Sequence, residues 1–248
     1  MSANVKRVHY YHADASALGG HIERPIREQL PVQSSLSLPP VGGFAAIRSE
    51  NFRLHDIVSA KATHTQVAGS QHPETGNATT IATTVVEGLD VLHVVTADRV
   101  VSQISVEHPS NGYDPRVTFF GSQIENLRIA GHPVEVILEP DIFDHGHHKN
   151  FPNSPAVRDS RFLKRIGQKY DEKKGYVLCS LVKDIKGQFP GTRKGHILEI
   201  PDFGAVYLAE FLADATSHRL IMMRMELGCP TQGTLSAASA AIEGRGYP

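Results

Sequence analysis

The sequence predicts an all-β fold, in which an antiparallel meander forms a β-sandwich or a barrel. Three observations support this prediction: β-branched stretches that alternate between apolar and polar positions, turns rich in proline and glycine between them, and a segment that recurs along the chain. With 248 residues, of which 40% are hydrophobic, the chain is long enough to bury a sizeable core. We therefore expect a single β-rich domain over residues 1–248.

The recurring segment organises this prediction. Residues 50–60 align without a gap on residues 87–97, and a shorter copy starts at Glu125. Because apolar and polar residues alternate in the first two copies, we expect them to form the long strands Phe52–Ala62 and Leu89–Val100. The predicted repeat units cover about residues 50–86, 87–124 and 125–139.

A second short pattern, His-Pro-x-x-Gly, follows each of the first two copies. It occurs at His72 and again at His108, and proline and glycine together favour a reversal of the chain. Return strands are expected at Ala78–Val86 and Arg116–Phe120. Both histidines are interpreted as parts of the local turn geometry.

The regions on either side of the repeat differ in character. Ahead of it, a strand candidate around Val8–Ala17 is expected to end at Gly19-Gly20, and Leu30–Leu38 is predicted to be an edge strand because prolines punctuate it. After it, residues 140–175 are predicted to be an insertion with a His-rich loop and a short basic helix around residues 155–167. Closing strands over residues 176–241 complete the domain. They include a hairpin whose methionines are expected to pack in the core.

The most concentrated group of potential metal ligands lies in the His-rich loop at residues 141–148. The five candidate ligands are Asp141, Asp144, His145, His147 and His148. In an extended segment His145 and His147 point to the same side, and imidazoles combined with carboxylates suit zinc, iron or copper. The order of these residues matches no standard metalloenzyme motif, so a solvated loop is the alternative interpretation. Motifs for a catalytic nucleophile or an organic cofactor are absent, and we predict neither.

Composition excludes several classes of function. A net charge of −1 without a basic block argues against binding to nucleic acid, and no apolar run is long enough to predict a membrane span. No secretory signal is visible, which predicts a cytoplasmic location by default.

Cys179 and Cys229 both lie in apolar, strand-like contexts. They are predicted to be buried thiols, with a disulfide as the alternative in an oxidising compartment.

Residues 95–100, Val-Thr-Ala-Asp-Arg-Val, together with the segment Gly121–Val134, resemble the strands of bacterial choice-of-anchor β-rich surface proteins. The resemblance covers about residues 50–137. It implies an all-β repeat domain at the cell surface, with no established activity and no catalytic residues to transfer.

These observations favour a non-enzymatic structural or binding module that self-associates, as a homo-oligomer, or binds a partner through its sheet edges. The segments Leu30–Leu38 and Thr231–Ala241 are the predicted pairing edges. The alternative is a metal-dependent enzyme that acts on a small molecule through the loop at residues 141–148. A lectin-like domain is a third interpretation, disfavoured because the chain has no tryptophan.

Overall fold

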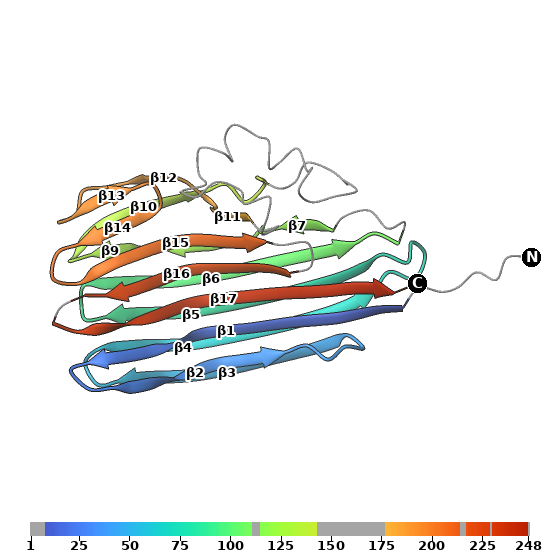
Figure 1. The fold of residues 1–248 in the computed structure, drawn as a ribbon, viewed down its shortest axis with the longest axis horizontal. Helices are drawn as coiled ribbons and strands as arrows, with labels where there is room; N and C mark the ends of the chain where they lie inside the picture. The colour runs from blue at the N-terminus through green and yellow to red at the C-terminus, as the bar shows by residue number, and fades with distance from the viewer. Residues whose placement is uncertain (1–7, 111–114, 143–176, 214–216, 229, 248) are drawn as a thin grey trace, which may run out of the picture.

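The computed structural model describes residues 8–110, 115–142, 177–213, 217–228 and 230–247. Over these residues the chain forms strands and no helix, and the strands make two antiparallel sheets (Figure 1). The all-β prediction is confirmed, and the two open sheets form a sandwich rather than a closed barrel. The helix predicted around residues 155–167 lies outside the described residues. The described part of the chain contains no helix that could span a membrane.

The two sheets use different parts of the chain. Sheet 1 contains the strands nearest to both chain ends: β1 (Val8–Arg24), β2 (Glu28–Ser37), β11 (Val177–Ser180), β13 (Thr192–Lys194), β14 (Ile197–Ile200), β15 (Gly204–Ala213), β16 (Ser217–Leu227) and β17 (Gln232–Tyr247). Sheet 2 contains the predicted repeat: β3 (Gly43–Leu54), β4 (Val58–Gln71), β5 (Ala78–Val91), β6 (Val95–His108), β7 (Arg116–Thr118), β8 (Gln123–Glu125), β9 (Leu127–Ile129), β10 (His132–Leu138) and β12 (Val182–Lys186).

Sheet 1 has the order β13-β14-β15-β16-β17-β1-β2, with β11 beside β15. Strand β2 is an edge, as predicted for Leu30–Leu38. The prediction that Thr231–Ala241 is an edge is wrong, because β17 pairs with β16 on one side and with β1 on the other. The low charge and small side chains that suggested an edge instead suit a central strand, whose alanines 237, 238 and 240 are fully buried.

Strand β1 also differs from its prediction, because it does not end at Gly19-Gly20. It pairs with β17 almost from end to end, from Val8 opposite Tyr247 to Arg24 opposite Gln232. A Cβ atom at Gly20 would lie 2.2 Å from the carbonyl oxygen of Thr234. The glycine therefore allows the two strands to approach closely instead of breaking the first one.

Sheet 2 has the order β12-β10-β9-β6-β5-β4-β3, with β7 and β8 also beside β6. The prediction that Phe52–Ala62 and Leu89–Val100 are continuous strands is wrong. Each segment is a tight hairpin, because the chain reverses between β3 and β4 and again between β5 and β6. The alternating pattern arises from the two arms of each hairpin, which both contribute apolar residues to one core.

Each copy of the recurring segment also contains a kink. Its second residue, Asn51, Gly88 or Asn126, has a positive φ, of 56°, 60° and 51° respectively. Glycine adopts this left-handed conformation freely, and asparagine tolerates it better than most residues. The recurring Glu-Asn/Gly pattern therefore marks the point at which regular pairing is interrupted, four residues ahead of the first turn residue in the first two copies.

The hairpin turns stack on one another at one end of the molecule. The Leu92 amide of the second turn donates a hydrogen bond to the Ile57 carbonyl of the first, at 2.8 Å. The Ala130 amide donates in the same way to Val94, at 2.6 Å, and in sheet 1 Gly228 donates to Phe203, also at 2.6 Å. We call this end of the sandwich the turn end.

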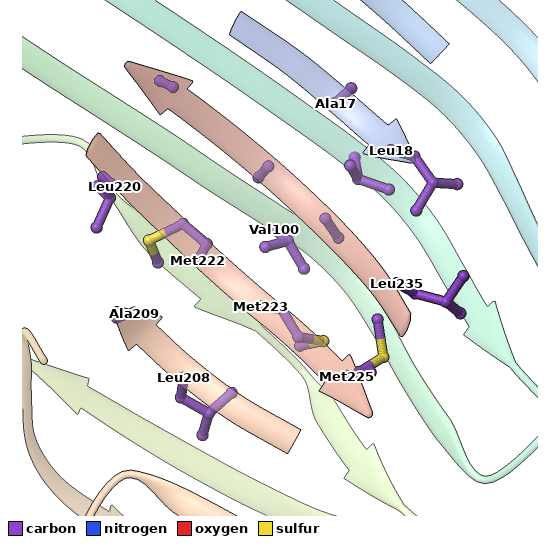
Figure 2. Packing of buried hydrophobic residues seen from close by; sticks show 14 of the residues in the cluster. Ala17, Leu18, Val100, Leu208, Ala209, Leu220, Met222, Met223, Met225 and Leu235 are labelled. Atoms are coloured by element: carbon purple, nitrogen blue, oxygen red, sulfur yellow. The ribbon is translucent and has the colours of Figure 1, made fainter. Parts of the chain in front are cut away.

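The core lies between the two sheets. Figure 2 shows Met222, Met223 and Met225 of β16 beside Val100 of β6, and all four side chains are fully buried. The prediction that these methionines are core residues is confirmed. Cys179 is buried in β11 as predicted, whereas Cys229 lies outside the described residues, so their pairing stays untested.

Candidate functional site

Only one of the five predicted metal ligands lies in the described residues. Asp141 is exposed in the turn that follows β10, whereas Asp144, His145, His147 and His148 fall outside the described part of the chain. Within that part, no three histidine, cysteine, aspartate or glutamate side chains form a group that could hold a metal ion. Zinc, iron or copper binding by this loop therefore stays a prediction.

An ion cluster on the outer face of sheet 1 is the first group of charged side chains that the fold brings together. Arg224 of β16 donates two hydrogen bonds to the Glu210 carboxylate of β15, from Nε at 2.7 Å and from Nη2 at 3.0 Å. The same guanidinium pairs with Glu226, and its central carbon lies 3.6 Å from the ring centroid of Tyr207. His196 approaches the Glu210 carboxylate at 3.4 Å.

This ion cluster is electrostatically satisfied. Burial opposes ionisation of Glu210, but hydrogen bonds with His196 and Arg224 outweigh it, so its pKa lies below the usual value. Burial also opposes the charge on Arg224, and its bonds with Glu210 and Glu226 outweigh that cost and raise its pKa. Because the donors of Arg224 are used by these partners, the cluster is suited to joining β15 and β16 rather than to reacting with a substrate.

A histidine cluster lies inside the opposite end of the molecule from the stacked turns. His9 of β1 and His108 of β6 come from different sheets, and their ring centroids are 4.6 Å apart. Tyr11 packs edge-on against His9 at 4.7 Å. His218 of β16 is buried and acts electrostatically on His108. We call His9, His108 and His218 the histidine cluster, and this end of the sandwich the histidine end.

Burial shifts the titration of this cluster. Desolvation lowers the pKa of His9 below its usual value. Desolvation also lowers the pKa of His108 to about 4, with further lowering by His9 and His218 and an opposing hydrogen bond with the Gly244 backbone. At neutral pH both rings are therefore uncharged. The interpretation of His108 as a local turn residue is wrong, because its ring packs against the other sheet.

Exposed apolar side chains gather on one edge of the sandwich. Among the described residues, five of the eight large exposed apolar side chains lie between residues 26 and 47: Ile26, Val32, Val41, Phe44 and Ile47. They belong to β2, to β3 and to the segments that lead into them. These two strands are the adjoining edges of sheets 1 and 2 at the bottom of Figure 1.

The two edge strands differ in how open they are to pairing. Strand β2 contains Pro31, which lacks an amide hydrogen, and Ser34, which has a φ of 47°. Both features interfere with the addition of another strand. The first half of β3, Gly43–Ile47, has no charge and no proline, and its one positive φ, of 112°, lies at its first residue, Gly43. Within the described residues β3 pairs with β4 alone.

Two surface depressions lie near the edge strands β2 and β3. One lies beside β3 and is lined by residues that include Ala46, Arg48 and His64. The other lies at the turn between β1 and β2 and is lined mainly by polar residues, among them His21, Arg24 and Glu28. Neither is lined by the histidine cluster or by the ion cluster on sheet 1. They provide open, polar surfaces rather than an enclosed site for catalysis.

Neither the ion cluster nor the histidine cluster is predicted from the sequence. Their members come from strands that are far apart in the sequence, such as His9 and His108, so no short motif contains them. One signal could have placed His9 in the interior. His9 lies two residues ahead of the buried Tyr11, and residues two apart in a strand face the same side.

Comparison with known proteins gives a family but no activity. The model of a domain of unknown function, DUF8256, matches the chain in two overlapping stretches, residues 9–174 and 145–214. No curated protein and no solved structure matches the chain. Because the two stretches together span well over half of its length, the chain belongs to the DUF8256 family.

Proposed function

We propose that the chain is a non-enzymatic β-rich structural module that self-associates through the open edge strand β3. The observation that carries this proposal is the gathering of exposed apolar side chains along β2 and β3. Phe44 exposes 67% of its surface and Val41 exposes 89%. A cluster of this kind on an otherwise polar surface is typical of an interaction site.

The backbone of β3 also supports self-association through this edge. An edge strand presents amide and carbonyl groups that can pair with another strand. A second copy of the chain, placed antiparallel to the first, would extend sheet 2 and cover Phe44 and Ile47 in the same step. Because Gly43–Ile47 contains no charge, two copies can meet there without opposing like charges. Identical strands paired in this way form a closed two-fold dimer.

Light scattering over a range of concentrations tests this proposal. The wild-type chain is expected to change from monomer to dimer between low and high micromolar concentrations. The double variant V41K/F44K should remain monomeric, because it places two charges beside the pairing strand without disturbing the core. Phe120→Lys is the matched control, since Phe120 is similarly exposed but lies away from this edge. A wild-type chain that is monomeric throughout would overturn the proposal, as would a V41K/F44K variant that still forms dimers.

A further inference from the structure

The histidine cluster brings three titratable side chains close together at one end of the sandwich. Its imidazoles come from both sheets, because His108 lies at the end of β6 in sheet 2 and His9 and His218 belong to sheet 1. They lie where the start of β1 pairs with the end of β17 (Figure 1). We propose that the cluster is an acid-sensitive clasp, which holds the two sheets together at this end when its rings are neutral and releases β1 and β17 when they are protonated.

The surroundings of His108 contain no compensating negative charge among the described residues that act on it. Strand β1 contributes His9, and β16 contributes His218; these are the charged groups that act on His108. Strand β17 contributes only the Gly244 backbone, and a Cβ atom there would lie 2.9 Å from the His108 ring. Each added proton therefore places positive charge next to another imidazole in a partly desolvated site.

The carboxylates of the same strands face elsewhere. Asp14 and Glu243 both lie near His12 on the exposed face of sheet 1, at 3.3 Å and 3.5 Å. Glu107 accepts a hydrogen bond from Asn77 at 2.8 Å. These three carboxylates therefore interact with His12 and Asn77, and not with the rings of His9 and His108.

The direction of the effect follows from proton linkage. A histidine whose pKa is lower in the closed state than in the open state takes up a proton when the clasp opens. Opening is therefore independent of pH above about 6.5 and becomes more favourable as the pH falls from 6.5 towards 4. For His108 alone, the difference between 6.5 and about 4 corresponds to a rise of about 300-fold in the opening constant. The lowered pKa of His9 acts in the same direction.

The segments that open are defined by the strand pairing. Residues 8–13 of β1 pair with residues 242–247 of β17, and this stretch includes His9, Tyr11 and Gly244. Its release would remove β17 from the start of β16, where Ser217 lies opposite Glu243. Acid would thus convert an interior position of sheet 1 into an open edge. This inference does not depend on self-association through β3, which lies in the other sheet.

Hydrogen exchange of the full chain, measured by mass spectrometry from pH 7.5 to pH 4 and corrected for intrinsic exchange, tests this clasp. Amides in residues 8–13 and 242–247 should lose protection below about pH 6.5, while those of the stacked turns keep it. The loss should reverse when the pH is raised.

The variant His108→Gln removes the main titrating group and should shift the loss of protection to lower pH. His93→Gln makes the same change on an exposed ring at the turn end and should leave the profile unchanged. If His108→Gln does not fold, His9→Gln replaces it with the same expectation. Protection that is independent of pH in the wild type, or an identical acid-induced loss in wild type and variant, would overturn the inference.

Discussion

The two ends of the sandwich achieve order by different means. At the turn end, successive hairpins hold one another through backbone hydrogen bonds such as the one from Leu92 to Ile57. At the histidine end, long strands finish against one another through side chains, with His9 and His108 in contact across the two sheets. Backbone hydrogen bonds do not titrate near neutral pH, whereas imidazoles do. We therefore expect the turn end to respond to changes in backbone geometry and the histidine end to respond to pH.

The largest effect is expected from a steric change at the turn end. Gly204 has a φ of 126°, and a Cβ atom there would lie 2.0 Å from the Glu226 carbonyl oxygen. Gly204→Ala should lower the free energy of unfolding by at least about 3 kcal/mol, because backbone has to move. Gly131→Ala, at a positive φ with no atom within 4 Å, should cost only about 1 kcal/mol. Urea unfolding at neutral pH measures both, and equal losses would contradict the steric explanation.

The next largest effect is expected from lowering the pH, which acts on the histidine end. The free energy of unfolding should fall by about 3 kcal/mol as the pH drops from 6.5 towards 4, because the unfolded chain protonates His108 first. The pKa of Glu210 is lowered, so its contribution to stability is fully present above the usual carboxyl pKa and is lost as the pH falls from that value through the lower pKa of the folded state. Glu210→Gln should therefore change the slope of stability against pH below about 4.5 and leave the slope between 6.5 and 4.5 intact. Urea titrations at several pH values separate the two phases, and a single acid phase would count against this assignment.

A smaller effect is expected at the kink in β3, which the recurring segment places near the turn end. Asn51 has a φ of 56°, where a β-branched side chain is strained. Asn51→Val should lower stability by about 2 kcal/mol. Asn51→Gly should change stability by less than about 0.5 kcal/mol, because glycine adopts this φ freely. Thermal unfolding distinguishes the pair, and a tolerated valine would show that the kink is not needed.

The smallest effect is expected where side chains join two loops at the histidine end. Asn77 donates a hydrogen bond to Glu107 at 2.8 Å and accepts one from the Ser110 amide at 3.1 Å. Asn77→Ala should lower stability by about 1 kcal/mol, since the partners remain accessible to water. Asp90→Ala, which removes the bonds to His93 within one turn at the other end, should have a similar cost. The two variants should differ in hydrogen exchange: Asn77→Ala loosens two loops, and Asp90→Ala loosens one.

Local sequence predicted those features whose geometry is set within a few residues. The turn at His72 is an example, because the His72 Nδ1 atom accepts hydrogen bonds from the Glu74 and Thr75 amides of its own turn. The hairpin of β15 and β16 is another, since its strands and their connection are adjacent in the sequence. The core position of the methionines followed from the apolar character of β16.

Other predictions failed because one local pattern suits more than one structure. Residues 52–62 alternate as a strand does, yet the chain reverses at His55, a non-glycine residue with a φ of 49°. The Ile57 amide donates to the Leu54 carbonyl within the turn, and the hydrogen bond from Leu92 of the next turn adds to this. In the same way, His72 and His108 occupy equivalent motifs, but the first caps its own turn and the second packs against His9.

Local sequence patterns were enough to predict antiparallel strands, an edge at β2, and a core position for the methionines of β16. Three features emerge only in the folded molecule: the central position of β17, the open edge at β3, and the meeting of imidazoles from distant strands at the histidine end. The physical reason is the separation along the chain over which each kind of interaction acts. Strand propensity, turn chemistry and apolar alternation act between near neighbours in the chain, whereas strand order and desolvation depend on which surfaces meet after the chain has folded.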